Sequence, residues 1–303
     1  MKEKTVSTRV FFRNECIHMG VALVVVILCN FLPYRVPEII EGNITISKSY
    51  KGHLSWVWIL AYVLLCAVCL FAVSFLFTQP DDRSKVLRRE FLVCVRSFCN
   101  VFIVAILLNK FIGMPRPCFF DMCKYDPTSQ RDHRYGVSGR VGSISKCTAD
   151  LSLVKDSVRS VPAMGAIWYY TALALTLMGC YQLMIKSQRV NKKLSTLLFY
   201  CLLAVLMNAA FFLSAVDIHY GYNWVTDHIV SALLSVFLVL WTSNSIHNRY
   251  FYSIMYNSYS FQTVTKASPD FALAESPDMI KDYMFQRLVV SAPPAEFVNW
   301  CLC

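Results

Sequence analysis

Charged residues are scarce in this chain. Asp, Glu, Lys and Arg together make up 16% of the 303 residues, whereas hydrophobic residues make up 56%. Ordinary soluble domains carry about a quarter charged residues, so this composition excludes a typical soluble protein. The composition therefore predicts a membrane protein.

Other features are missing as well. The chain has no internal repeat and no metal-ligand spacing, apart from Cys66 and Cys69, which fall inside an apolar run and are predicted to be core. We therefore expect no metal and no cofactor. The formal net charge of +10 could suit nucleic acid, but the basic residues flank apolar runs and no soluble module presents them. We expect no nucleic-acid partner, because anionic lipid headgroups and membrane topology account for the charge.

What the chain does have is long apolar runs. Helices of about 18 or more apolar residues can cross a bilayer, and six runs qualify, at about 16–34, 55–78, 91–113, 161–185, 195–216 and 226–246. They predict an all-α fold, a bundle of six transmembrane helices over residues 16–246, between tails at 1–15 and 247–303. The first run could also be a signal peptide. No small-residue cleavage pattern follows Pro33, so an uncleaved span is favoured.

The distribution of Lys and Arg predicts the orientation. Both gather in the N-terminal tail and in the second and fourth links, whereas the link from Asp217 to Val225 has neither. The positive-inside rule then places both termini in the cytoplasm and a large loop, about 114–160, on the exoplasmic side. Asn43, in the chain's only glycosylation acceptor pattern, falls in the first exoplasmic loop, which agrees. The pattern favours the plasma membrane, with the endoplasmic reticulum or another secretory membrane as the alternative.

Three of the thirteen cysteines, Cys118, Cys123 and Cys147, share the large predicted loop. The exoplasmic compartment is oxidising, so we expect one disulfide and one thiol left over. We favour a bond between Cys123 and Cys147, because Cys118 is held next to Pro117. Eight other cysteines fall inside the runs and are interpreted as small apolar fillers.

The C-terminal tail changes in character from His247 onward. It mixes tyrosines with Ser, Pro and charges of both signs and shows no long helical period, which predicts a mostly flexible cytoplasmic extension. Protein partners or tyrosine phosphorylation would find room there, although a plain disordered tail is favoured. Cys301 and Cys303 do not form a prenylation pattern, and their lipidation stays open.

An Arg-Pro pair follows the third run directly, in Ile112-Gly113-Met114-Pro115-Arg116-Pro117. An arginine fixed by proline at the mouth of a helix bundle presents a planar fork of donors that suits phosphate or carboxylate oxygens. Two further boundaries lie on the same predicted side. Pro162 takes a first-turn position in the fourth run, where unpaired amides favour phosphate, and Asp227 lies in the first turn of the sixth.

These features resemble the lipid phosphate phosphatases of the type 2 phosphatidic acid phosphatase superfamily. The resemblance covers residues 16–246 and includes the long loop between spans three and four. That family reads Lys, six residues, Arg-Pro; then Pro-Ser-Gly-His; then Ser-Arg, five residues, His, three residues, Asp. In a complete member the resemblance implies metal-independent hydrolysis. The third-motif His takes the phosphoryl group, the second-motif His protonates the leaving oxygen, and Lys and two Arg neutralise the phosphate.

Part of that machinery is retained. Arg116 and Pro117 match the first motif, Pro162 the second and Asp227 the third. Arg116 and Lys110 are the candidate phosphate-binding residues. Plainer interpretations stay open: Arg116 as a snorkelling arginine at headgroup level and Asp227 as a complement to a helix N-terminus.

The reactive positions are degenerate. Asn109 stands at the Lys slot, Ala163 and Gly165 stand at the Ser and His slots of the second motif, and Asn223 stands at the nucleophile. Loss of a covalent nucleophile can cost about 10⁶ in turnover, and loss of a general acid about 10²–10⁴. No intact catalytic residue is therefore expected.

The second arginine is missing too. Counting back from Asp227 places Asp217 in its slot, and aligning on Ser214 gives Ala215 instead. His219 and His228 are the histidines nearest the third motif, and an atypical site could recruit one of them.

The sequence therefore predicts a catalytically inactive relative of these phosphatases. It would bind or present membrane phospholipids or lysophospholipids, or scaffold protein partners through its tail in lipid signalling. The alternative is an active, atypical lipid phosphatase that hydrolyses phosphatidate or lysophosphatidate at the exoplasmic face. The oligomeric state stays open.

Overall fold

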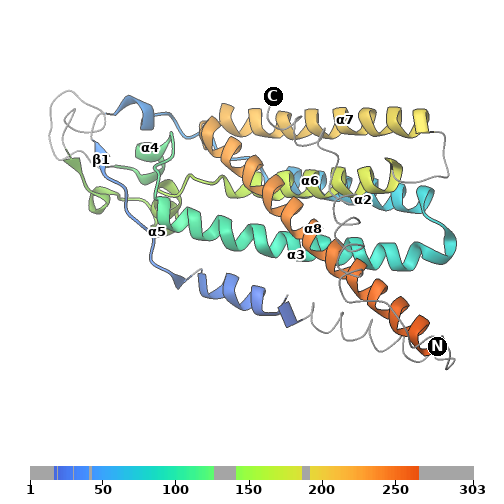
Figure 1. The fold of residues 1–303 in the computed structure, drawn as a ribbon. Helices are drawn as coiled ribbons and strands as arrows, with labels where there is room; N and C mark the ends of the chain where they lie inside the picture. The colour runs from blue at the N-terminus through green and yellow to red at the C-terminus, as the bar shows by residue number, and fades with distance from the viewer. Residues whose placement is uncertain are drawn as a thin grey trace. The chain divides into compact units, whose positions relative to one another are not determined.

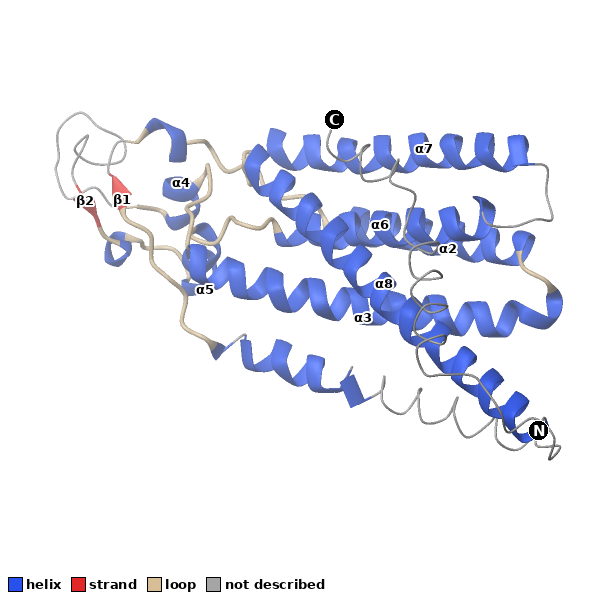
Figure 2. Cartoon of the chain, viewed as in Figure 1, coloured by secondary structure: helices blue, strands red, loops and turns tan. Residues whose placement is uncertain are grey.

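The computed structural model describes residues 17–18, 20–29, 31–40, 43–125, 141–185 and 192–265. The chain divides into two compact units, residues 1–250 and 251–303. The described part of the second unit is helical, from Phe251 to Thr265. The elements, of which the helices α2–α8 and the strands are labelled in Figures 1 and 2, are β1 (Ile39–Ile40), η1 (Ile44–Ile46), α2 (Trp56–Phe77), α3 (Pro80–Ile112), α4 (Phe119–Cys123), β2 (Val141–Gly142), η2 (Ile144–Lys146), α5 (Leu151–Ser157), α6 (Met164–Ile185), α7 (Lys192–His219) and α8 (Val225–Thr265).

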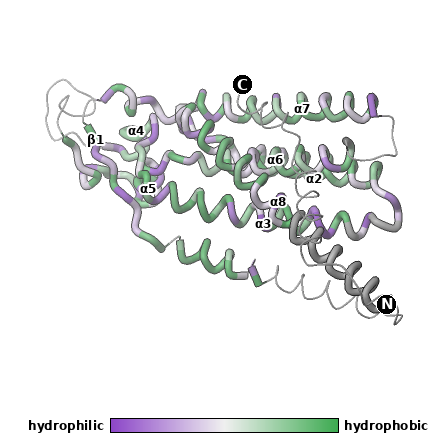
Figure 3. The backbone as a smooth tube through the Cα atoms, in the orientation of Figure 1, coloured by the Kyte–Doolittle hydropathy of each residue, from purple (hydrophilic) through white to green (hydrophobic). Residues whose placement is uncertain are grey.

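Four helices are long and apolar enough to cross a membrane: Trp56–Phe77, Val86–Ile112, Lys192–His219 and Val225–Ile246. Figure 3 shows that hydrophobic residues dominate these segments. Large apolar side chains, such as Leu64 on α2 and Phe212 on α7, are exposed on them. Apolar surface on this scale is unfavourable in water and favourable in lipid. The chain is therefore a membrane protein by the length and composition of its helices.

The described residues thus contain four such helices, whereas the sequence predicts six. The run at 161–185 does form a helix, α6, and the run at 16–34 contains a shorter apolar helix over Gly20–Cys29. α6 is not among the four candidate spans, and it packs against other helices with polar side chains such as Thr171 and Thr176 buried on it. A helix that faces protein rather than lipid can carry hydrogen-bonding groups.

α6 lies at the centre of the bundle. One apolar cluster packs α6 against α2 and α7, and a second packs it against α3 and the first part of α8. Gly179 allows a close approach to α2, since a Cβ there would lie 2.5 Å from Leu70 Cδ1 and the leucine side chain would have to move. Hydrogen bonds also join the helices, including one of 3.1 Å from Thr171 Oγ1 on α6 to Ser235 Oγ on α8. These contacts hold α6 in the bundle, and the cavity described below is found at its start.

The predicted loop at 114–160 folds into a cap, defined here by the described parts of residues 39–50 and 114–158. Its buried apolar core is Ile39, Ile46, Phe119, Phe120, Cys123, Tyr125 and Val158. β1 pairs with β2 in antiparallel register, with Ile39 opposite Gly142. The predicted disulfide between Cys123 and Cys147 is present, and Cys118 is a buried free cysteine. Residues 126–140 lie outside the described part of the chain.

The C-terminal boundary differs from the prediction. The sixth run was predicted to end at residue 246 and a flexible tail to follow, whereas α8 continues to Thr265. The polar residues after 246 conceal this helix from a hydropathy pattern, because a helix needs no apolar run once it leaves lipid. Cys301 and Cys303 lie outside the described residues, as does the predicted N-terminal tail at 1–15.

Candidate functional site

A cavity of about 280 Å³ lies where the helix bundle meets the cap. Its polar lining brings together residues that lie far apart in the sequence: Asn109, Lys110, Arg116, Asp156, Arg159, Asp217 and Asn223. Its apolar lining includes Leu54, Trp56, Ile59, Ile106 and Met164. The lining is therefore mixed in character, and it carries three cations and two carboxylates.

Local structure holds Arg116 at this cavity. α3 ends at Gly113, which adopts a left-handed conformation with φ 58° and turns the chain out of the helix. The N–H of Arg116 then donates to Ser157 O over 2.8 Å and ties the segment to α5. The Arg116 residue is only 4% exposed. The sequence interpretation of Arg116 as a snorkelling arginine is thus not what the fold shows, since its side chain is turned into the protein.

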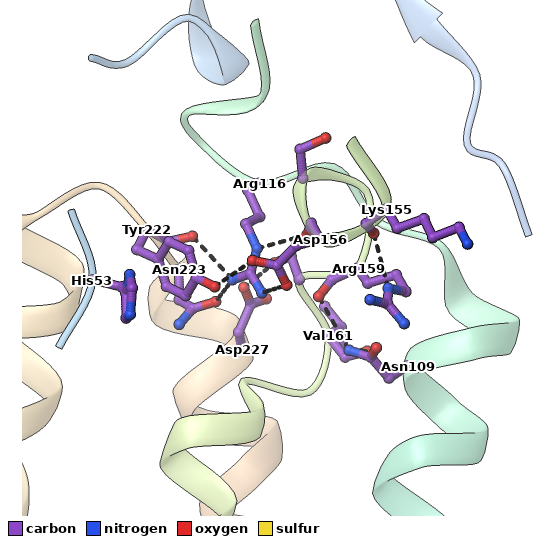
Figure 4. Close-up of polar contacts among 12 residues, drawn as sticks. His53, Asn109, Arg116, Lys155, Asp156, Arg159, Val161, Tyr222, Asn223 and Asp227 are labelled. Atoms are coloured by element: carbon purple, nitrogen blue, oxygen red, sulfur yellow. Dashed lines mark hydrogen bonds and ion pairs between the residues drawn. The ribbon is translucent and has the colours of Figure 1, made fainter. Parts of the chain in front are cut away.

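Arg116 donates to Asp156 in α5 and to Tyr222 and Asn223 in the link before α8 (Figure 4). Nε donates to Asp156 O over 2.8 Å and Nη2 to Asp156 Oδ1 over 2.9 Å. Nη1 donates to Tyr222 O and to Asn223 Oδ1, and Cζ lies 3.8 Å from the centroid of the Tyr222 ring. Burial alone would lower the pKa of Arg116, but Tyr222 and Asp156 outweigh it and raise the pKa. The guanidinium is a buried, fully charged group.

Asn223, at the predicted nucleophile position, links two charged groups. Its Oδ1 accepts from Arg116, and its Nδ2 donates to Asp217 Oδ2 over 2.6 Å. Asp217, one of the two residues assigned to the missing arginine, lies on α7 and faces the cavity with Asn223. An amide engaged on both sides holds charges in place, and its nitrogen lone pair is delocalised into the carbonyl, so it cannot replace imidazole as a nucleophile.

His219 and His228, the histidines that an atypical site could recruit, do not line the cavity. His228 is buried, with Nδ1 3.0 Å from Tyr169 OH and Nε2 3.2 Å from Asp217 Oδ2. That last contact is close in distance but lacks hydrogen-bond geometry, since Nε2 has no hydrogen-bond partner. His219 ends α7, and neither histidine lines the cavity. Both nitrogens of His228 face protein groups, so neither is presented to a substrate.

Asn109 and Lys110 line the cavity from the last turn of α3. Nδ2 of Asn109 faces three carbonyl oxygens ahead of α6, those of Arg159, Val161 and Pro162, at 3.1, 3.3 and 3.3 Å. It therefore holds the segment that carries the second motif. Lys110 lines the cavity, and its Nζ donates to Leu32 O over 2.9 Å.

Asp227 holds two helix starts together. It lies in the first turn of α8, is fully buried, and accepts from Ser160 Oγ and from the N–H of Trp224. Ser160 precedes α6, so the carboxylate joins the segments that lead into α6 and α8. Asp227 is the predicted complement to a helix N-terminus and also a link between segments.

The two remaining degenerate positions occupy different surroundings. Gly165 lines the cavity, and a Cβ there would lie 3.3 Å from Ile59 Cδ1. Ala163 is fully buried outside the lining, and its carbonyl accepts from Ser231 Oγ over 3.3 Å. Asn43, the glycosylation acceptor, begins η1, and its Oδ1 accepts from the Thr45 N–H and hydroxyl. The N–H of Lys48 donates to Pro117 O and so joins the two parts of the cap.

Asp156, Tyr222 and His53 are cavity residues that the sequence analysis did not single out. Asp156 is on α5, and Tyr222 and His53 lie in links next to helices. Burial raises the pKa of Tyr222 against the opposing effect of Arg116, so the phenol stays protonated. Its hydroxyl donates to Asp156 Oδ2. His53 Nδ1 lies 3.1 Å from Tyr50 OH, and its ring centroid lies 5.5 Å from that of Tyr222. Only contacts between distant segments identify these three residues.

The lining offers hydrogen-bond donors from three cations beside two carboxylates. His53 is the one imidazole among the described lining residues, and its Nδ1 faces a tyrosine rather than a carboxylate. Across the described ranges, no group of three or more His, Cys, Asp or Glu residues is arranged to hold a metal ion.

No protein-family model, no curated protein and no solved structure matches this chain. The family resemblance therefore rests on the motifs quoted above and stays a prediction.

Proposed function

We propose that this chain is a catalytically inactive, lipid-phosphate-phosphatase-related membrane protein that binds the phosphate group of phospholipids or lysophospholipids. In this proposal it has six spans, with the helix at Gly20–Cys29 and α6 completing the four long apolar helices, and both termini are cytoplasmic. The cavity then lies at the exoplasmic face of the plasma membrane or of another secretory membrane.

One observation carries the proposal. The buried cation Arg116 shares a single cavity with Asn109 and Asn223, the residues at the lysine and nucleophile positions of the resemblance. Phosphate recognition favours a fixed guanidinium, and phosphoryl transfer needs a nucleophile. The first requirement is met here, and the second is not met at its expected place.

The mixed lining of the cavity suits an amphiphile. Its cations, Lys110, Arg116 and Arg159, outnumber the carboxylates of Asp156 and Asp217 by one. Its apolar residues would contact the first carbons of an acyl chain. About 280 Å³ falls just below the usual range of small-molecule pockets, roughly 300–1,000 Å³, so a headgroup fits and whole acyl chains do not.

The test is binding of purified protein, in nanodiscs, to vesicles that contain lysophosphatidate or phosphatidate in a phosphatidylcholine background. We expect phosphate-dependent binding that Arg116→Ala abolishes and Arg116→Lys weakens, since lysine keeps the charge and loses the fork. Arg88→Ala is the matched control, because Arg88 is an exposed arginine near the opposite end of α3. Equal binding by all four proteins would contradict the proposal and would favour scaffolding of protein partners.

A second candidate function is atypical hydrolysis of the same lipids. The exposed imidazole of His53 at the cavity favours it, in place of the two histidines considered from the sequence. Release of inorganic phosphate from phosphatidate in mixed micelles tests this candidate. Turnover that His53→Ala removes and His18→Ala leaves intact would replace the inactive interpretation with an enzyme.

A further inference from the structure

The guanidinium of Arg116 already has an anion bound to it, and that anion belongs to the chain. Asp156 Oδ1 lies 2.9 Å from Arg116 Nη2, and Asp156 Oδ2 accepts a hydrogen bond from the Tyr222 hydroxyl. A planar carboxylate thus sits between two donors at the wall of the cavity (Figure 4). Phosphate monoesters and carboxylates both accept hydrogen bonds from a guanidinium, so the Asp156 carboxylate occupies the position that a phosphate ligand would take.

The two partners differ in how freely they can move. The side chain of Arg116 is 4% exposed and is held by four acceptor atoms, whereas the side chain of Asp156 is 34% exposed. Arg116 also contacts the backbone oxygen of Asp156, over 2.8 Å. That second contact does not involve the carboxylate. Rotation of the Asp156 side chain toward solvent would therefore leave Arg116 held in place and free both Nη2 and the Tyr222 hydroxyl.

We propose that Asp156 is an internal competitor: its carboxylate occupies the phosphate position at Arg116, and a phosphate monoester binds by displacing it. The ligand then accepts from Arg116 Nη2 and from the Tyr222 hydroxyl. This inference rests on the proposed function and specifies how its binding position is regulated. While the cavity is empty, the carboxylate also neutralises a buried cation, which would be costly to leave unpaired.

Competition of this kind lowers the apparent affinity by the fraction of molecules in which the position is open. A lipid headgroup and free phosphate share the chemistry that displaces Asp156. They differ in that a lipid could also contact apolar lining residues such as Trp56 and Ile59.

The experiment measures the apparent melting temperature of the full chain in nanodiscs as inorganic phosphate is added. Asp156→Asn removes the competing charge and keeps the shape of the side chain. We expect this variant to melt below the wild type without phosphate, and to be stabilised by phosphate at a concentration roughly tenfold or more below that needed by the wild type. Asp150→Asn is the control, because Asp150 is exposed beside the same helix and makes no side-chain cap.

Equal phosphate dependence in the wild type and Asp156→Asn would overturn the inference, as would weaker dependence in the variant. If Asp156→Asn folds only in phosphate, the rescue supports it. If that variant does not fold at all, Asp156→Glu replaces it, and an unchanged phosphate dependence then overturns the inference.

The proposed function is judged separately, by Arg116-dependent binding of the wild type to lysophosphatidate vesicles. Such binding without any effect of Asp156→Asn leaves the function standing and removes the competitor. Displacement of phosphate from Asp156→Asn by lysophosphatidate vesicles, but not by phosphatidylcholine vesicles, identifies the lipid headgroup as the ligand. Phosphate binding without such displacement identifies free phosphate.

Discussion

Asn223 connects Arg116 to Asp217: it accepts from the guanidinium through Oδ1 and donates to the carboxylate through Nδ2 over 2.6 Å. The position predicted for a nucleophile therefore carries a structural link between a cation and an anion. All three residues are buried. Because buried charged groups need partners, this amide has a stabilising role that can be measured apart from any chemistry.

Asn223→Ala is expected to destabilise the protein. It leaves the Arg116 and Asp217 groups each without one partner, at a cost of about 1–3 kcal/mol for each buried group. The apparent melting temperature should fall by several degrees. Asn208→Ala is the matched control, since Asn208 is exposed and donates only to Ala204 O in its own helix. A fall of the same size in both variants would contradict the role given to Asn223.

Gly113→Ala should be more damaging than Gly52→Ala. Both glycines have positive φ, 58° and 106°, so both substitutions strain the backbone. Only at Gly113 would the new Cβ also collide with another segment, 2.4 Å from Arg35 O, whereas nothing lies within 4 Å at Gly52. We expect a larger loss of folded yield and a larger fall in melting temperature for Gly113→Ala than for Gly52→Ala. Equal effects would show that backbone strain, and not the contact with Arg35, dominates.

Cys118 should resist alkylation in the native protein. Burial raises the pKa of its thiol to about 12, and the residue is fully buried. A raised pKa keeps the thiol neutral at every pH below that value, and the thiolate is the reactive form. Mass spectrometry after treatment with N-ethylmaleimide at pH 8 should find Cys118 unmodified in native protein and modified after denaturation. Rapid native labelling would mean that the cap opens on the timescale of the reaction.

Asn43 should be glycosylated when the chain is made in a secretory membrane. Asn43 is partly exposed and belongs to the cap, in which the Lys48 N–H donates to Pro117 O. A glycan there would place the cap, and with it the cavity, on the exoplasmic side. Treatment with peptide N-glycosidase should increase gel mobility, and Asn43→Gln should remove that shift. An unshifted wild-type band in cells that glycosylate a co-expressed control would oppose the proposed orientation.

The apolar runs predicted the lipid-facing helices well because lipid contact demands a continuous apolar surface. The run at 55–78 corresponds to α2 (Trp56–Phe77), and the run at 195–216 lies within α7 (Lys192–His219). The disulfide between Cys123 and Cys147 was also predictable, from compartment chemistry and the neighbouring proline. α6 forms where a run was predicted but is not among the four candidate spans, and packing against other helices imposes no such demand.

The polar cavity could be predicted only in part. The motif resemblance drew attention to Arg116, Asn109 and Asn223, and the fold brings all three to one cavity. Asp156 and His53 carried no signal, because their roles arise from contacts across the cap. The pairing of β1 with β2 was invisible for a related reason: strands of two residues have no measurable period.

The hydrogen bond between Ser160 Oγ and Asp227 Oδ2 links the segments that precede α6 and begin α8. The two residues are separated by 67 positions, yet together they set where α6 and α8 begin. Gly165 and Asn223 each lie within five residues of one member of this pair, and both line the cavity. We therefore expect the hydrogen bond between Ser160 and Asp227, neither of which lines the cavity, to affect the width of the cavity. Substitutions at Ser160, which no ligand in the cavity needs to touch, should change ligand fit by shifting both helices together.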